Sequence, residues 1–119
     1  MNQILIVEDE ARLAAFVEKG LRKNGFSTTV AADGEQALHM TQKSSFDLIL
    51  LDLKLPIKDG WTVLRELRTH SKQFPIIIVV TAMSDEQNRS AALKGGANDY
   101  VTKPFSFHDL LERVRAQLG

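Results

Sequence analysis

The residues best suited to chemistry are acidic, and they follow apolar runs. Asp52 ends the unbroken run Leu48–Leu51, and Glu8 and Asp9 follow the run Ile4–Val7. Short apolar runs between polar segments are typical of strands buried on both faces. An aspartate after such a strand is most often a turn residue or a helix cap, and the alternative is a catalytic or metal-binding carboxylate. The rest of the chain must decide between these interpretations.

Two other side chains with useful chemistry follow further β-prone segments. Thr81 ends the run Ile76–Val80, and Lys103 follows Asp99–Thr102. Taken singly, such a threonine is most often structural, and such a lysine is most often solvated. Together with a carboxylate, they make a site for a phosphoryl group, because hydroxyl and ammonium hold its oxygens while the carboxylate attacks.

The acidic residues also have the composition of a metal site. Glu8, Asp9 and Asp52 would repel one another within one crevice unless protons or a cation neutralised them. A ligand set of oxygens without Cys or His favours a hard cation, Mg²⁺ first. The sequence therefore predicts Mg²⁺ as the cofactor, with capping of the first helix by Glu8-Asp9 as the alternative.

Short apolar runs alternate with longer amphipathic segments, and this alternation must position the site. The expected strands cover residues 3–7, 27–31, 46–52, 76–81 and 99–102, each followed by a helix. The inward face of the first helix is expected to carry Leu13, Phe16, Val17 and Leu21. Such alternation indicates a parallel α/β sheet with helices on both faces. The expected doubly wound order 2-1-3-4-5 brings the acidic residues to the switch point between strands one and three.

Composition limits the remaining possibilities. At 119 residues, with 44% hydrophobic residues, the chain is expected to form one domain, residues 1–119. Fifteen basic and fifteen acidic residues balance, so the basic excess typical of direct nucleic-acid binding is absent. The lack of cysteine suits a cytoplasmic protein. The first apolar run is too short for a signal peptide or a membrane span, so no membrane partner is expected.

The residues at the strand ends belong to a larger and specific set. This set comprises Glu8-Asp9, Asp52, Pro56, Gly60, Thr81-Ala82 and Lys103-Pro104-Phe105. With these residues the chain resembles, over its whole length, a receiver domain of two-component response regulators. The resemblance implies a flavodoxin-like or CheY-like (βα)5 fold with strand order 2-1-3-4-5. It also implies a signalling switch that a sensor histidine kinase phosphorylates, and that catalyses only its own phosphorylation and dephosphorylation.

The resemblance implies a role for each site residue. Asp52 would be the phosphoacceptor, and Mg²⁺ would be bound by Asp9, Asp52, the backbone carbonyl of Lys54 and, through water, Glu8. Thr81 and Lys103 would hold the phosphoryl oxygens. Tyr100 would be an aromatic switch that turns inward when Thr81 moves toward the phosphoryl group.

The local sequence is most similar to regulators of the OmpR/PhoB type. Those regulators bind DNA through a C-terminal winged-helix domain, and this chain ends at Gly119, so that output domain is expected to be missing. The subfamily dimerises on phosphorylation through helix four, strand five and helix five, and the matching residues are Arg89, Asp99, Arg113 and Arg115. Departures from the pattern are Ala91, Lys94, Asn98 and Lys54, the last replacing a common Met close to Asp52.

Two rival functions share parts of this pattern. A Mg²⁺-dependent phosphohydrolase would use the same aspartyl-phosphate chemistry, but its usual general acid is an Asp two residues after the nucleophile, where this chain has Lys54. A non-enzymatic interaction module would not need the complete set of site residues. A signalling switch is therefore the favoured interpretation.

Overall fold

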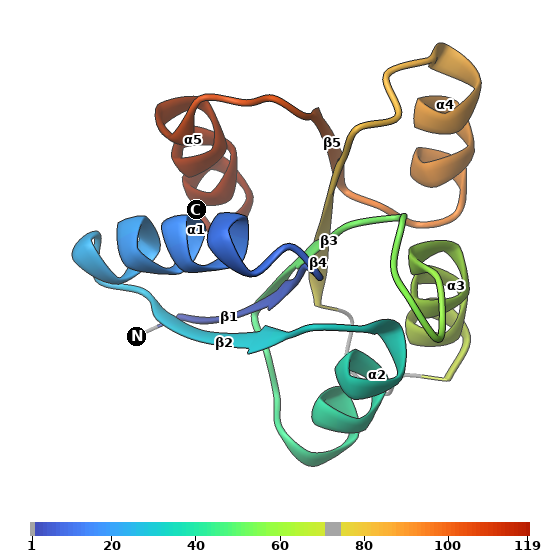
Figure 1. Ribbon diagram of the computed structural model, residues 1–119, viewed down its shortest axis with the longest axis horizontal. Helices are drawn as coiled ribbons and strands as arrows, with labels where there is room; N and C mark the ends of the chain where they lie inside the picture. The colour runs from blue at the N-terminus through green and yellow to red at the C-terminus, as the bar shows by residue number, and fades with distance from the viewer. Residues whose placement is uncertain (1, 71–74) are drawn as a thin grey trace.

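Strands and helices alternate strictly along the chain (Figure 1). The computed structural model describes residues 2–70 and 75–119. Within these residues the strands are β1 (Gln3–Val7), β2 (Ser27–Ala31), β3 (Leu48–Leu51), β4 (Ile76–Thr81) and β5 (Asp99–Thr102). The helices are α1 (Ala11–Lys23), α2 (Gly34–Lys43), α3 (Gly60–His70), α4 (Glu86–Lys94) and α5 (Phe107–Leu118).

The strands pair in parallel in the order β2-β1-β3-β4-β5, which confirms the predicted doubly wound α/β topology. Val7 pairs with Leu51, and Thr81 pairs with Thr102, so the carboxyl ends of the strands meet along one edge. The pairing continues for one residue past β3, where the Asp52 N–H donates to the Val7 carbonyl over 3.1 Å. This edge therefore places the residues that follow β1 and β3 side by side.

Helices cover both faces of the sheet, with α1 and α5 on one side and α2, α3 and α4 on the other (Figure 1). Successive strand residues alternate between the two apolar cores: Ile49 and Leu51 pack toward α2, α3 and α4, whereas Leu48 and Leu50 pack toward α1 and α5. All four residues of β3 are buried. Burial on both faces explains why this strand is continuously apolar rather than alternating.

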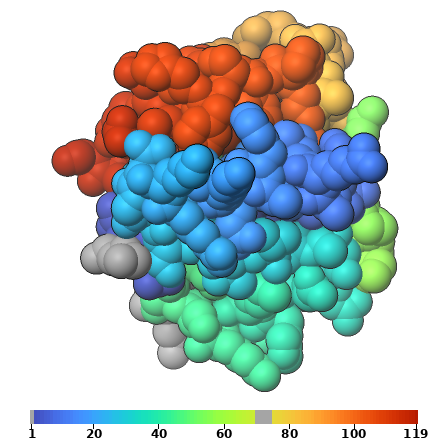
Figure 2. All heavy atoms as spheres, turned by 60° about the vertical axis from the view of Figure 1, so that its left-hand side comes forward, coloured from blue at the N-terminus to red at the C-terminus, as the bar shows by residue number. Residues whose placement is uncertain are grey.

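The prediction that Phe16 belongs to the inward face of α1 is wrong. Val17 and Leu21 are buried, but the Phe16 side chain is 54% exposed. Its ring packs edge-to-face with that of Phe107, the first residue of α5, at a centroid distance of 5.9 Å. The surfaces of α1 and α5 adjoin on this side of the molecule (Figure 2). Gly20 leaves the space that this aromatic pair needs, since a β-carbon there would lie 2.4 Å from the Phe107 ring.

The ends of the elements follow local sequence signals. The Ser106 hydroxyl caps α5 by accepting from the Asp109 N–H over 3.0 Å. The strand expected over residues 46–52 is shorter in the structure, where Phe46, Asp47 and Asp52 lie outside β3. Within residues 2–70 and 75–119, no helix has the length and apolar character needed to span a bilayer.

Candidate functional site

Three carboxylates meet where β1 and β3 end. One oxygen from each of Glu8, Asp9 and Asp52 lies within 4.8 Å of the others. Glu8 and Asp52 are buried, with exposed fractions of 7% and 5%, whereas Asp9 is exposed. The doubly wound order produces this cluster, since β1 and β3 are neighbours in the sheet although far apart in sequence. The structure thus brings together the acidic residues that the sequence singled out.

The ammonium group of Lys103 lies between two of these carboxylates. Its Nζ donates to Glu8 Oε1 over 2.6 Å and to Asp52 Oδ2 over 2.8 Å. The backbone fixes the start of this side chain, because the Lys103 N–H donates to the Thr81 carbonyl over 2.8 Å, one step past the pairing of β4 with β5. Lys103 therefore supplies a positive charge inside the acidic cluster.

Burial and ion pairing oppose each other in this cluster. Burial raises the pKa of Glu8, although its bond to Lys103 acts in the opposite direction. Burial alone would lower the pKa of Lys103, but the bonds to Asp52 and Glu8 outweigh it and leave that pKa raised. Lys103 consequently stays protonated at neutral pH, and its bond to Glu8 helps to keep that buried carboxyl group ionised.

The loop between β3 and α3 is held closely against Asp52. The Lys54 N–H donates to Asp52 Oδ1 over 3.1 Å, and the Gly60 N–H donates to the Leu53 carbonyl over 2.9 Å. A β-carbon on Gly60 would lie 2.1 Å from the Asp52 carbonyl oxygen, so only glycine fits there. On the far side of the loop, a β-carbon on Gly34 would lie 2.0 Å from the Lys58 carbonyl oxygen. Two glycines thus let the backbone approach closely enough to fix the loop.

Thr81 and Tyr100 are linked through a residue that the sequence did not indicate. Thr81 is fully buried at the end of β4, and its hydroxyl accepts from the Met83 N–H at 3.5 Å. Tyr100 is 5% exposed, and its hydroxyl donates to the Met83 carbonyl over 2.6 Å. Burial raises the pKa of Tyr100, and the charges of Asp85 and Asp52 add to this effect. No residue type marks Met83 as functional, because its backbone makes both contacts.

The residues expected at a dimer surface form pairs within the chain. Arg113 bonds both carboxylate oxygens of Asp99, over 2.9 and 3.0 Å. Arg89 lies 3.8 Å from Glu86 on α4. Arg115 does not join the Asp99 group: two residues further along α5 it lies on nearly the opposite side of the helix, and it donates to Asn24 Oδ1 over 3.0 Å.

The donor set fits the predicted magnesium ion. Three carboxylates within reach of one another supply hard oxygen ligands, and neither His nor Cys takes part in the cluster. Among residues 2–70 and 75–119, Lys103 supplies the one ammonium group bonded to the cluster, and a single positive charge cannot balance three ionised carboxylates. A divalent cation would remove the remaining negative charge, which is the chemical reason to expect one here.

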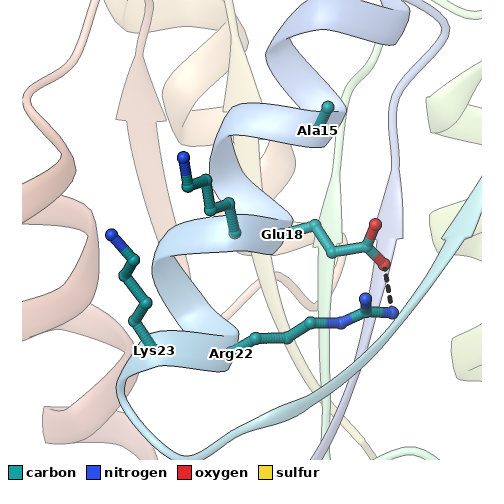
Figure 3. A pocket seen from close by; sticks show the side chains of 5 residues that line it. Ala15, Glu18, Arg22 and Lys23 are labelled. Carbon is teal, nitrogen blue, oxygen red and sulfur yellow. Dashed lines mark hydrogen bonds and ion pairs between the residues drawn. The ribbon is translucent and has the colours of Figure 1, made fainter.

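A hollow on α1 lacks these properties. It is lined by Ala15, Glu18, Lys19, Arg22 and Lys23, all from one helix (Figure 3). Glu18 and Arg22 pair across it over 3.1 Å, and Lys23 points away from this pair (Figure 3). Because no other element contributes to the lining, the hollow is a solvated helix surface rather than a convergent site.

Fold and site together define a doubly wound α/β domain with an acidic cluster, a bridging lysine and a buried threonine at the carboxyl edge of its sheet. Residues 4–115 match the family model described as the response regulator receiver domain. The chain therefore belongs to the receiver domain family of response regulators. Among curated proteins it is 45% identical, over 116 residues, to the transcriptional regulatory protein HprR of Escherichia coli, covering 98% of this chain and 51% of HprR. The chain thus spans about half the length of that relative.

Solved structures agree with this assignment. The receiver domain of Francisella response regulator 1452 superposes with a TM-score of 0.94 at 33% identity, covering 98% of this chain and 96% of that one. The response regulator TrrA of Thermotoga maritima, in complex with Mg²⁺ and BeF, gives a TM-score of 0.88 at 33% identity, covering 98% and 99%. The likeness extends over nearly the whole of all three chains.

Proposed function

We propose that this chain is a phospho-accepting signalling switch, in which Asp52 takes a phosphoryl group from a phosphohistidine of a sensor histidine kinase. The observation that carries the proposal is the Lys103 ammonium group, which bonds Asp52 and Glu8 inside a cluster of three carboxylates. A nucleophilic carboxylate beside a fixed cation is suited to phosphoryl transfer, because the cation stabilises the charge that develops on the phosphoryl oxygens.

In the proposed transfer, an Asp52 carboxylate oxygen forms a bond to phosphorus as the phosphorus–nitrogen bond of phosphohistidine breaks. The leaving imidazole nitrogen keeps the bonding electron pair and is protonated by solvent. Asp9, Asp52, the Lys54 carbonyl and, through water, Glu8 would hold Mg²⁺, which when bound offsets negative charge on the reacting oxygens. A receiver structure solved with Mg²⁺ and BeF supports this choice of ion.

Lys103 has a donor to offer a phosphoryl oxygen. Its Nζ donates to Glu8 and to Asp52, and an ammonium group carries three N–H donors. In the proposed reaction Lys103 bonds a phosphoryl oxygen while it keeps the contact with Glu8, which opposes the rise that burial causes in the pKa of Glu8.

The signal leaves the site through Thr81 and Tyr100. As the Thr81 hydroxyl moves to a phosphoryl oxygen, it releases the Met83 N–H, and Met83 is the residue whose carbonyl accepts from Tyr100. The loop between β4 and α4 therefore couples the site to the surface of α4, β5 and α5. The Asp99–Arg113 pair lies in that region, and exchanging it between two copies would favour a dimer.

The output is proposed by analogy with the relatives. HprR is a transcriptional regulatory protein, and this chain corresponds to about half of it. We therefore propose that the receiver controls dimerisation or transcription, with DNA contacted by a C-terminal winged-helix domain and not by this domain. The chain catalyses only its own phosphorylation and dephosphorylation.

Phosphotransfer to Asp52→Asn tests the proposal. A ³²P-labelled histidine kinase, or acetyl phosphate with Mg²⁺, is expected to label the wild-type chain and the surface control Asp109→Asn, but not Asp52→Asn. Undiminished labelling of Asp52→Asn would disprove the proposal, because the phosphoryl group would then reside elsewhere. Turnover of a generic phosphomonoester by the wild-type chain would instead support the hydrolase alternative.

A further inference from the structure

Ile57 combines two costly properties beside the site. Among the described residues it is the one non-glycine residue with a positive φ, at 69°. The left-handed region is especially unfavourable for a β-branched side chain, so this conformation lowers the stability of the fold. The Ile57 side chain is also 73% exposed, so it gains little from burial in the free chain. Phe16, the other large hydrophobic residue found exposed in the described part of the chain, lies in a helix and packs on Phe107.

The neighbouring backbone holds Ile57 in this position. The Lys58 N–H donates to the Pro56 carbonyl over 2.8 Å, closing a tight turn around Ile57. Gly34 packs against the Lys58 carbonyl, and Lys58 Nζ lies 3.6 Å from Glu66 of α3. A backbone already held in one conformation loses little further freedom when a partner covers the residue.

Ile57 must also lie close to the nucleophile. Gly60 touches the backbone of Asp52, as the 2.1 Å separation of its ideal β-carbon from the Asp52 carbonyl oxygen shows. Ile57 is three residues from Gly60, which places its α-carbon at most about 11 Å from that of Gly60. A standard protein interface covers about 800 Å² on each partner, a patch with a radius of about 16 Å. A protein donor whose contact patch is centred on the Asp52 carboxylate is therefore wide enough to reach Ile57.

We propose that Ile57 is a docking residue for the protein donor, burying its side chain against an apolar surface beside the donor's phosphohistidine. This inference rests on the proposed function and identifies a contact that a small-molecule donor does not make. Covering an exposed apolar side chain is favourable. The strained, exposed isoleucine therefore stabilises the complex with the kinase rather than the free chain. Ile57 thereby favours protein donors over small ones.

The test compares two donors on two variants. Ile57→Asn removes the apolar surface and tolerates the left-handed backbone, whereas Ile57→Leu keeps an apolar side chain. The protein donor is whichever purified, autophosphorylated histidine kinase of the source organism labels the wild-type chain fastest, and the small donor is acetyl phosphate with Mg²⁺. For Ile57→Asn we expect kcat/KM from the kinase to fall by roughly tenfold, with labelling by acetyl phosphate unchanged. Ile57→Leu should regain most of the kinase rate.

Each other outcome overturns the inference in a distinguishable way. Wild-type transfer from the kinase to Ile57→Asn shows that no donor surface covers the residue. An equal fall with both donors shows that Ile57 shapes the site instead. Labelling of the wild-type chain by acetyl phosphate but by no kinase removes the docking role and leaves Asp52 as an acceptor, whereas labelling by neither donor removes the proposed function itself. Urea unfolding of both variants checks that each is folded.

Discussion

Replacing Lys103 by methionine tests the charge balance of the site. The change removes the ammonium group that bonds Glu8 and Asp52, and it keeps most of the aliphatic volume. Removing one partner of a buried ion pair costs about 3–5 kcal/mol. The Lys103 side chain is 19% exposed and Asp9 faces solvent, so water screens part of that cost. We therefore expect the free energy of unfolding to fall by about 2 kcal/mol at neutral pH without metal.

This loss should depend on pH. Burial raises the pKa of Glu8 above its ordinary value, and the bond to Lys103 opposes that rise. Without Lys103 the pKa of Glu8 in the folded state lies higher still, so the folded variant binds a proton before the unfolded chain does. A folded state that binds more protons becomes more stable as the pH falls. The difference from the wild-type chain should accordingly be largest above neutral pH and shrink as the pH falls through the raised pKa of Glu8.

Urea unfolding followed by circular dichroism measures both effects. The wild-type chain and Lys103→Met are compared at about pH 8 and about pH 5.5 in EDTA, and again at pH 8 with millimolar Mg²⁺. Magnesium is expected to reduce the loss, since it supplies the missing positive charge. Lys54→Met, which removes an exposed cation close to Asp52, is the control and should change stability by less than about 0.5 kcal/mol. An equal loss under all three conditions would refute the charge argument and assign the loss to packing.

Two further substitutions test single contacts. Gly60→Ala places a β-carbon against the Asp52 carbonyl oxygen, so we expect the free energy of unfolding to fall by roughly 2–3 kcal/mol and Asp52 to be labelled more slowly. Gly95→Ala, in right-handed helical backbone, is the control and should change both quantities little. Asn98→Asp should raise the free energy of unfolding by about 0.5–1 kcal/mol, measured by thermal unfolding. The reason is that the Asn98 side-chain oxygen already accepts from Arg68, whose other bonds are to backbone carbonyl oxygens. A gain that persists at about pH 3, where the new carboxyl group is protonated, would contradict this reason.

The strand ends could be predicted because burial leaves a simple mark on the sequence. A parallel strand covered on both faces needs apolar residues throughout, so the first polar residue marks where it emerges. Val7 and Leu51 are the last buried residues of paired strands, and Glu8 and Asp52 follow them. The doubly wound order then makes β1 and β3 neighbours, which requires no knowledge of side-chain packing.

Contacts made by backbone groups could not be predicted from the sequence in this way. The Met83 carbonyl and N–H link Tyr100 to Thr81, and any residue type offers those groups. Helical periodicity assigned Phe16 to the core, but an aromatic ring at the junction of two helices can pack on a surface partner instead. The positive φ of Ile57 was also hidden, since glycine or asparagine is the usual sign of a left-handed turn.

The charge balance of the site explains the role of Thr81 in the proposed switch. Glu8, Asp9 and Asp52 contribute three negative charges when ionised, and Lys103 contributes one positive charge, which leaves two negative charges for a divalent cation to balance. A phosphoryl group carries a charge of about −1.5 to −2. Forming the acyl phosphate removes the single negative charge of the Asp52 carboxylate, so the site gains about −0.5 to −1 in total. The bound cations no longer balance the site, so hydrogen-bond donors must stabilise the added charge. The buried Thr81 hydroxyl is the donor at the adjacent strand end, and the excess charge is therefore what draws it away from Met83 and loosens the support of Tyr100.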